Sequence, residues 1–192
     1  MAKTNKLPKL LTSESGTDFI KVFQYVREAI DVGYPECYAF TQQWEGGYVN
    51  DKDDRGGETK YGISQKAHPD VDIKNLTKEE AKKIYKHKYW DKLRLGLVDN
   101  EEIAIEIFDF GINAPMRTAV LALQRSVTLI GYPTKIDGKI GNNTIAAVNF
   151  ASRYYSKALL AAFRGYEFLH YKNIVLRNPS QSKFIRNWLA RI

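Results

Sequence analysis

The most informative segment of the chain is residues 44–64, which read Trp-Glu-Gly-Gly-Tyr-Val-Asn-Asp-Lys-Asp-Asp-Arg-Gly-Gly-Glu-Thr-Lys-Tyr-Gly-Ile-Ser. A glycine pair, Gly46-Gly47, directly follows Glu45. Glycine is favoured just past the C-terminus of a helix because it adopts positive φ without steric cost. The segment therefore predicts a helix over about residues 36–45 and places the Glu45 carboxyl group on its last turn.

The loop after this helix is rich in carboxylates and glycines. Asp51, Asp53 and Asp54 precede a second glycine pair, Gly56-Gly57, and this composition is typical of a tight turn. A glutamate that faces such a loop suits the hydrolysis of a glycosidic bond, because one acid must stay protonated while another stays ionised.

Trp44, the neighbour of Glu45, favours a proton donor if its indole lies against the Glu45 carboxyl group, because this contact raises the pKa of that group. Two other interpretations of the segment stay open. In the first, the two neighbours diverge on the helix, Trp44 faces the core and Glu45 is a solvated helix end. A calcium loop with Asp51, Asp53 and Glu58 as ligands is the second alternative, but the alternation and terminal glutamate of an EF-hand are missing. We predict no metal site.

The rest of the first half is predicted to be mainly helical. Apolar residues recur at three- and four-residue steps over 17–32, and residues 49–64 are expected to form a small hairpin. Thr77 and Glu80 form a capping box for a helix that continues to Trp90. Residues 101–112 are apolar nearly all round, which predicts a buried central helix.

Two pairs of side chains on these helices have a structural and a functional interpretation. Tyr89 and Trp90 could stack on sugar rings, but aromatic residues at helical spacing more often belong to the core. Glu106 and Asp109 lie three residues apart, close enough to share a helix face, and form the rival carboxylate pair. We interpret Asp109 as a hydrogen-bonded structural acid or a residue of the cleft floor.

The second half of the chain is predicted to be entirely helical. One helix begins near Pro115 and ends at Gly131, and a tight loop follows around Asp137-Gly138. A long helix then runs from about Thr144 to Asn178-Pro179, and a last short helix contains Phe184, Ile185 and Trp188.

Several of these motifs, in this order, resemble glycoside hydrolase family 108, a lysozyme-like family of N-acetylmuramidases. The similar motifs are Glu45-Gly-Gly-Tyr-Val-Asn-Asp, Asp54-x-Gly-Gly-x-Thr59-x-Tyr-Gly-Ile-Ser, Phe108-Asp109-Phe-Gly-Ile-Asn113 and Ile136-Asp137-Gly138-x-Ile-Gly141-x-x-Thr144. The last is similar to the predicted peptidoglycan-binding segment that closes these proteins. The resemblance covers about residues 36–192, and Lys52 and Arg55 depart from it, standing where the family often has proline.

The resemblance implies a peptidoglycan hydrolase that cleaves the β-1,4 bond between N-acetylmuramic acid and N-acetylglucosamine. Glu45 would be the general acid, Asp54 would stabilise the developing positive charge or orient water, and Thr59 would help to hold that water. The substrate-binding residues would be Tyr48, Tyr61 and Asn113. Some relatives are called secretion activator proteins, so the alternative is a non-catalytic cell-wall-binding or secretion accessory protein on the same fold.

The composition is that of a globular protein with an anionic partner. The 192 residues carry a formal net charge of +7, which favours nucleic acid, an anionic membrane surface or the acidic cell wall. Lysines and arginines are spread along the chain without a block of five and without a nucleic-acid motif. Such a surface serves solubility as often as binding, and it is the resemblance that makes peptidoglycan the expected partner. We expect no nucleic acid, no membrane insertion and no cofactor. The oligomeric state stays open.

The expected fold class is mostly α (α+β): a lysozyme-like helical domain with a small β-hairpin beside the active-site cleft. Residues 1–16 are expected to be flexible, 17–113 to form the muramidase domain with an added N-terminal helix, and 114–192 to form a helical peptidoglycan-binding segment packed on it. Residues 1–16 lack the apolar run of a secretory signal. We therefore expect synthesis in the cytoplasm and action at the cell wall, after release by a holin-like or export partner.

The cysteine and histidine content fits this expectation. The single cysteine, Cys37, excludes an intramolecular disulfide, and we expect it to be a small apolar residue on the helix before Glu45. The three histidines are far apart in the sequence and lack the spacing of metal ligands.

Overall fold

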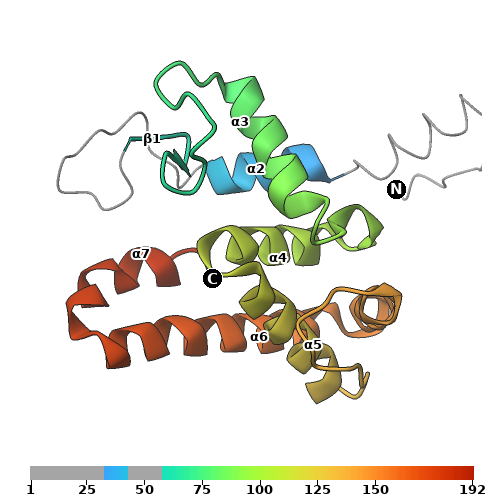
Figure 1. The fold of residues 1–192 in the computed structure, drawn as a ribbon. Coiled ribbons are helices and arrows are strands. Elements are labelled where there is room, and N and C mark those ends of the chain that lie inside the picture. The colour runs from blue at the N-terminus through green and yellow to red at the C-terminus, as the bar shows by residue number, and fades with distance from the viewer. Residues whose placement is uncertain (1–32, 43–57) are drawn as a thin grey trace, which may run out of the picture. The chain divides into compact units, whose positions relative to one another are not determined.

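The computed structural model describes residues 33–42 and 58–192, which belong to one compact unit spanning 33–192 (Figure 1). The segments predicted as a flexible N-terminus (1–16) and as an added helix (17–32) lie outside the described residues. The carboxylate-rich loop and the Glu45 end of the preceding helix lie outside them as well. The domain boundary at residues 113 and 114 stays a prediction.

Helix α2, Tyr34–Gln42, is the helix that leads towards Glu45 in the sequence. It begins two residues earlier than predicted, after Gly33 at φ 91°. Pro35 lies in its first turn, where a missing N–H group leaves no hydrogen bond unmade. Tyr34, Cys37 and Tyr38 recur at helical spacing and form its buried face. Burial raises the pKa of the Cys37 thiol to about 12, so this residue has the apolar role predicted for it.

Strands β1, Thr59–Lys60, and β2, Ile63–Ser64, form a two-residue hairpin in which Thr59 pairs with Ser64 and Lys60 with Ile63. Tyr61 and Gly62 form the turn with φ of 51° and 73°. Positive φ at both central residues is the requirement of a type I′ turn, which matches the twist of the strands. Residues 49–57 of the predicted span lie outside the described residues, and the described part of the hairpin runs from Thr59 to Ser64.

Helix α3, Lys78–Tyr85, starts with the predicted capping box. The Thr77 hydroxyl accepts from the Glu80 N–H at 3.2 Å, and the Glu80 carboxylate accepts from the Thr77 N–H at 2.9 Å. A π-helical turn, η2 (Lys86–Trp90), continues the helix and buries Trp90. The core interpretation of Trp90 is thus confirmed, and Tyr89 packs partly buried against the same core.

Helix α4, Glu101–Asn113, is the buried central helix that the sequence predicted. The Asn100 side chain caps it by accepting from the Ile103 N–H at 3.1 Å. Phe108 lies at the middle of the core and contacts the rings of Tyr34, Tyr85 and Trp90, with ring centroids 5.9–6.5 Å apart. Because α2, α5 and α6 all contact α4, its position determines theirs.

The second half contains helices α5, Met116–Leu129, and α6, Asn142–Arg177. Tyr155 interrupts α6 with φ −141° and ψ 40°, so its two arms run in different directions (Figure 1). A 3₁₀ turn, η4 (Pro179–Phe184), and helix α7 (Ile185–Leu189) fold back on α6, where Trp188 stacks on Tyr171 at 5.2 Å. A further 3₁₀ turn, η3 (Leu95–Leu97), precedes α4.

The fold is mostly α with one small antiparallel hairpin, as predicted (Figure 1). Over residues 33–42 and 58–192, no helix combines the length and the apolar character that crossing a membrane requires.

Candidate active site

Three of the six predicted site residues, Glu45, Tyr48 and Asp54, lie outside the described residues. The other three, Thr59, Tyr61 and Asn113, are described and lie on two different elements. Thr59 and Tyr61 belong to the hairpin, and Asn113 is the last residue of α4. Their roles as site residues stay predictions, and their surroundings decide what each side chain is able to do.

The hairpin is held by contacts from both of its strands. Ile63 on β2 is 1% exposed and anchors the hairpin in the core, and the Gln65 N–H donates to the Glu58 carbonyl at 2.8 Å. Thr59, opposite Ser64, is half-buried. Its hydroxyl therefore belongs to an element whose backbone is fixed on two sides.

Tyr61 is held at the tip of the hairpin in a conformation that is uncommon for a side chain of its size. Its φ of 51° is left-handed, a region in which a bulky residue is an outlier that the surrounding structure must impose. The Tyr85 hydroxyl donates to the Tyr61 carbonyl at 3.2 Å, and Lys60 Nζ lies 5.6 Å from the centre of the Tyr61 ring. The half-buried ring is thus presented by a fixed backbone beside a cation.

Asn113 ends α4 with its side chain exposed. Its amide nitrogen donates back to the Asp109 carbonyl at 2.8 Å and to the Asp109 carboxylate at 3.3 Å. Among the described residues no donor reaches its side-chain oxygen, so the described structure leaves one oriented acceptor. An acceptor of this kind suits a sugar hydroxyl or an N-acetyl N–H group.

The rival carboxylates on α4 are buried and each faces an arginine. Asp109 is 3% exposed and accepts two bonds from Arg191, at 2.9 Å from Nε and 2.6 Å from the guanidinium terminus. Glu106, 7% exposed, accepts from Arg164 Nε at 2.8 Å and from a second guanidinium nitrogen. Burial raises the pKa of Glu106 and the Arg164 bond opposes that rise. Ion-paired acids without access to solvent fit the structural role that we assigned to Asp109.

Glu167 on α6 is a third buried carboxyl group and was not anticipated from the sequence. Burial, together with the charges of Glu106 and Asp109, raises its pKa to about 8, while the Tyr171 hydroxyl donates to it at 3.3 Å. It is a protonated acid near neutral pH, but an exposed fraction of 2% keeps it from a polymeric substrate. In the sequence, Glu167 lies four residues from both Phe163 and Tyr171 and so shares their helix face, which was the available signal that it is buried.

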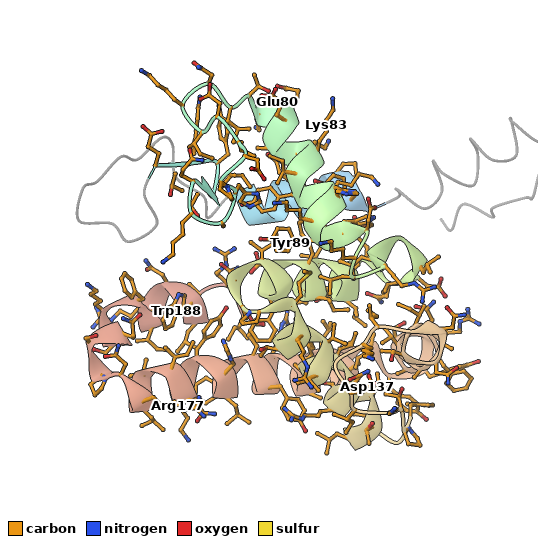
Figure 2. The ribbon with its side chains drawn as sticks, in the orientation of Figure 1. Glu80, Lys83, Tyr89, Asp137, Arg177 and Trp188 are labelled. Carbon is orange, nitrogen blue, oxygen red and sulfur yellow. The ribbon has the colours of Figure 1, made fainter. Side chains whose placement is uncertain are left out.

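Two surface cavities lie away from the predicted site residues. One of about 530 Å³ is lined by residues 70–84, including Asp72, Glu80 and Lys83. The other, of about 380 Å³, lies over the loop 134–144, where the buried Gln124 amide donates to Asp137 at 3.1 Å. Figure 2 shows Glu80 and Lys83 on one side of α4 and Asp137 on the other. Neither cavity is lined by Thr59, Tyr61 or Asn113.

Within the described residues, no group of three His, Cys, Asp or Glu side chains is arranged to hold a metal ion. Asp72 accepts from Asn75 at 2.9 Å, and Glu80 belongs to the capping box. Two of the three acids that line the larger cavity, Asp72 and Glu80, are therefore engaged in local turn and cap hydrogen bonds.

The family comparison divides the described structure into two segments. Residues 38–114 match the family model Glycosyl hydrolase 108, and residues 118–192 match the model Predicted Peptidoglycan domain. Residues 38–114 are thus similar to glycosyl hydrolase family 108. The two matches together support a glycoside hydrolase of the peptidoglycan-hydrolase kind, with peptidoglycan as its partner.

The fold comparison agrees with the family. The solved structure titled "Structure of Brucella abortus SagA" is similar with a TM-score of 0.64 and 26% identity, over 82% of this chain and 88% of that chain. No curated protein matches the sequence.

The two matched segments differ in charge. The hydrolase segment 38–114 carries 12 Lys and Arg against 15 Asp and Glu, and the peptidoglycan segment 118–192 carries 11 against 2. Their net charges are −3 and +9, so the basic excess of the chain lies in the second segment. The pairs Glu106–Arg164 and Asp109–Arg191 join a buried acid of the first segment to an arginine of the second, and Arg191 is buried as well.

Proposed function

We propose that the chain is an N-acetylmuramidase that hydrolyses the β-1,4 bond between N-acetylmuramic acid and N-acetylglucosamine. The observation that carries the proposal is the match of residues 38–114 to the Glycosyl hydrolase 108 model. That one segment contains Glu45, Asp54 and Thr59. Peptidoglycan is the polymer in which this bond occurs, and the cell wall is accordingly the place of action.

In the proposed reaction, Glu45 donates its proton to the oxygen that leaves the anomeric carbon as the glycosidic bond breaks. A water molecule supplies the hydroxyl group that replaces it. Asp54, ionised, either stabilises the positive charge that develops on the sugar or orients this water, and Thr59 helps to hold it. General acid catalysis of this type contributes about 10²–10⁴-fold to the rate.

The surroundings of the three buried acids among the described residues, Glu106, Asp109 and Glu167, support the assignment of Glu45. A general acid must reach the leaving oxygen and carry a proton at working pH. Asp109 and Glu106 are buried and bonded to arginines, and Glu167 carries a proton but is 2% exposed. None of these three side chains meets both requirements.

Tyr61 and Asn113 are proposed to contact the sugars. The fixed backbone of the hairpin tip presents the Tyr61 ring, and an aromatic ring with a polar edge suits the mixed surface of a pyranose. Asn113 offers an oriented amide oxygen. Tyr48 is assigned as the third contact.

The substitution Glu45→Gln tests the proposal, because it removes the transferable proton and keeps the shape of the side chain. We expect the release of reducing ends from purified peptidoglycan to fall by at least about 10²-fold with an unchanged melting temperature. Glu36→Gln is the matched control: it makes the same change at an exposed position of α2. Its activity should stay within about twofold of the unsubstituted protein, since a surface change of this kind is energetically small.

Near-normal activity of the Glu45→Gln protein would exclude Glu45 as the proton donor. If the unsubstituted protein binds peptidoglycan but releases no reducing ends, the cell-wall-binding accessory function is favoured instead.

A further inference from the structure

Four aromatic side chains form a continuous cluster at the interruption of α6: Tyr132, Phe150, Tyr154 and Tyr155. The ring centroids of Tyr132 and Phe150 lie 5.1 Å apart, those of Phe150 and Tyr154 4.9 Å, and those of Tyr132 and Tyr155 6.1 Å. We call this cluster the aromatic corner. It lies wholly within the segment 118–192 and shares no residue with the candidate active site.

The aromatic corner faces solvent instead of the core. Phe150 is 52% exposed, Tyr154 60% and Tyr155 54%. Single exposed apolar residues are ordinary on a protein surface, but rings that contact one another form a patch, and patches mark interaction sites. These three rings lie outside the buried core, and the partly buried Tyr132 joins them to it.

The break in α6 assembles the corner. Phe150 and Tyr154 lie four residues apart on the arm before the break, and so share one helix face. At Tyr155 the backbone leaves the helical region, and its ring meets Tyr132 from the loop after α5. Three separate parts of the segment thus contribute rings to one surface.

Two cations lie close to the rings in the sequence. Arg153 directly precedes Tyr154 and Lys157 follows Tyr155 by two residues; both are exposed on α6, in a segment of net charge +9. Arg153 lies 3.6 Å from Asp99, but both side chains are more than half exposed, and such pairs contribute little to stability. The corner therefore combines aromatic faces, phenolic hydroxyls and positive charge.

We propose that the aromatic corner is a second, non-catalytic binding surface for peptidoglycan and that it takes the glycan strand. The C–H faces of the sugars would lie on the rings, and the phenols would bond to hydroxyl and N-acetyl groups. Arg153 and Lys157 would face the carboxylates of the peptide stems, so the charge of the surface complements that of the polymer. This inference rests on the proposed function only in taking peptidoglycan as the ligand.

Sedimentation with purified peptidoglycan sacculi tests the proposal, with every variant made in the Glu45→Gln protein so that the wall is not consumed. The double substitution Phe150→Ala and Tyr154→Ala should weaken binding about tenfold or more, which corresponds to about 1.4 kcal/mol. Phe168→Ala is the matched control: this aromatic on the same helix is 44% exposed and makes no ring contact with the corner. Its affinity should stay within about twofold of the parent protein.

Three outcomes would contradict the proposal that the aromatic corner binds the glycan strand. The first is equal affinity of the double variant and its parent for sacculi. Loss of binding to anionic phospholipid vesicles with sacculus binding retained would assign the corner to a membrane surface. A dimer that dissociates in the double variant, with sacculus binding retained, would assign it to a second copy of the chain.

Two further measurements keep the test decisive. If the double variant unfolds, Tyr154→Ala alone decides, because its ring is the most exposed of the cluster. The release of reducing ends by the unsubstituted protein is measured in parallel. No release would end the proposed muramidase function whatever the binding result, whereas release combined with unweakened binding by the double variant would end only the present inference.

Discussion

The hydrolase segment and the peptidoglycan segment of this chain are built differently. Within the described part of 38–114 lie the hairpin, a π-helical turn and the two left-handed non-glycine residues, Tyr61 and Arg94. The segment 118–192 contains helices and one 3₁₀ turn, η4, with connecting loops, and it carries the basic excess. Irregular backbone and acids suit a site that cuts, whereas regular helices with positive charge suit a surface that holds an anionic polymer.

The contrast also explains how the two segments are joined. Acids of α4 meet arginines that lie 58 and 82 residues further along the chain. A buried acid or a buried arginine alone would be costly, so each segment compensates a charge that the other buries. Removing one side of this junction should therefore have a larger effect on stability than a change within either segment.

The largest expected effect is that of Asp109→Asn, which leaves the Arg191 guanidinium facing a neutral amide. Both side chains of the pair are less than a tenth exposed. Breaking such a pair typically costs about 3–5 kcal/mol, or roughly 10 °C in melting temperature for a chain of this length. Thermal unfolding followed by circular dichroism measures it.

The matched control is Asp99→Asn. Asp99 and Arg153 also join the two segments, but both are exposed, so the expected cost is below about 1 kcal/mol. Equal decreases in melting temperature for Asp109→Asn and Asp99→Asn would show that the buried pair contributes no more to stability than the exposed pair. Loss of turnover by Asp109→Asn at an unchanged melting temperature would move the chemistry to α4 and contradict the assignment of Glu45.

The next effect depends on pH and belongs to Glu167. Its pKa is raised from 4.5 to about 8, chiefly by burial, with Glu106, Asp109, Tyr171 and Arg191 as the charged or titratable groups around it. Below pH 4.5, the pKa of this group in the unfolded state, the Glu167 carboxyl group is protonated in both states, and its raised pKa does not lower the free energy of unfolding. The loss of stability grows as the pH rises from 4.5 to about 8 and reaches its full value above about pH 8.

Glu167→Gln should therefore stabilise the protein by roughly 1–3 kcal/mol at pH 8, with the gain vanishing near pH 4.5. Urea unfolding at a series of pH values checks it. A gain that does not vary with pH would mean that Glu167 does not titrate in this window. A loss of stability at pH 8 would mean that its ionised form is bound and stabilised.

The smallest expected effect concerns Tyr61. Asparagine tolerates the left-handed conformation better than tyrosine does, so Tyr61→Asn should keep the turn and remove the ring. We expect the KM for soluble peptidoglycan to rise about threefold with little change in kcat, because the ring contributes to binding and not to bond cleavage. An unchanged KM would remove Tyr61 from the substrate contacts.

The elements of the fold were largely predictable because local signals define their ends. Thr77 with Glu80 marked the start of α3, Gly131 followed the end of α5, and Asn178-Pro179 followed α6. These signals act within a few residues, so a single sequence displays them. The buried character of α4 was equally visible, since its apolar residues occur on all sides.

The features that depend on distant contacts were not predictable from the sequence. Nothing near Arg191 indicates that it pairs with Asp109, because the pairing exists only once α6 and α7 have folded back. The break of α6 at Tyr155 has no glycine or proline to announce it. The aromatic corner escaped notice for the same reason, since its rings come from a loop, from the first arm of α6 and from the break itself.

The central claim is the bond that is cut, and the products formed from purified peptidoglycan test it most directly. The digest is reduced with borohydride and its fragments are identified by mass spectrometry. An N-acetylmuramidase leaves N-acetylmuramic acid at the new reducing end, so the account predicts fragments that end in reduced muramic acid. Fragments that end in reduced N-acetylglucosamine, or in a non-reducible anhydro sugar, would contradict it.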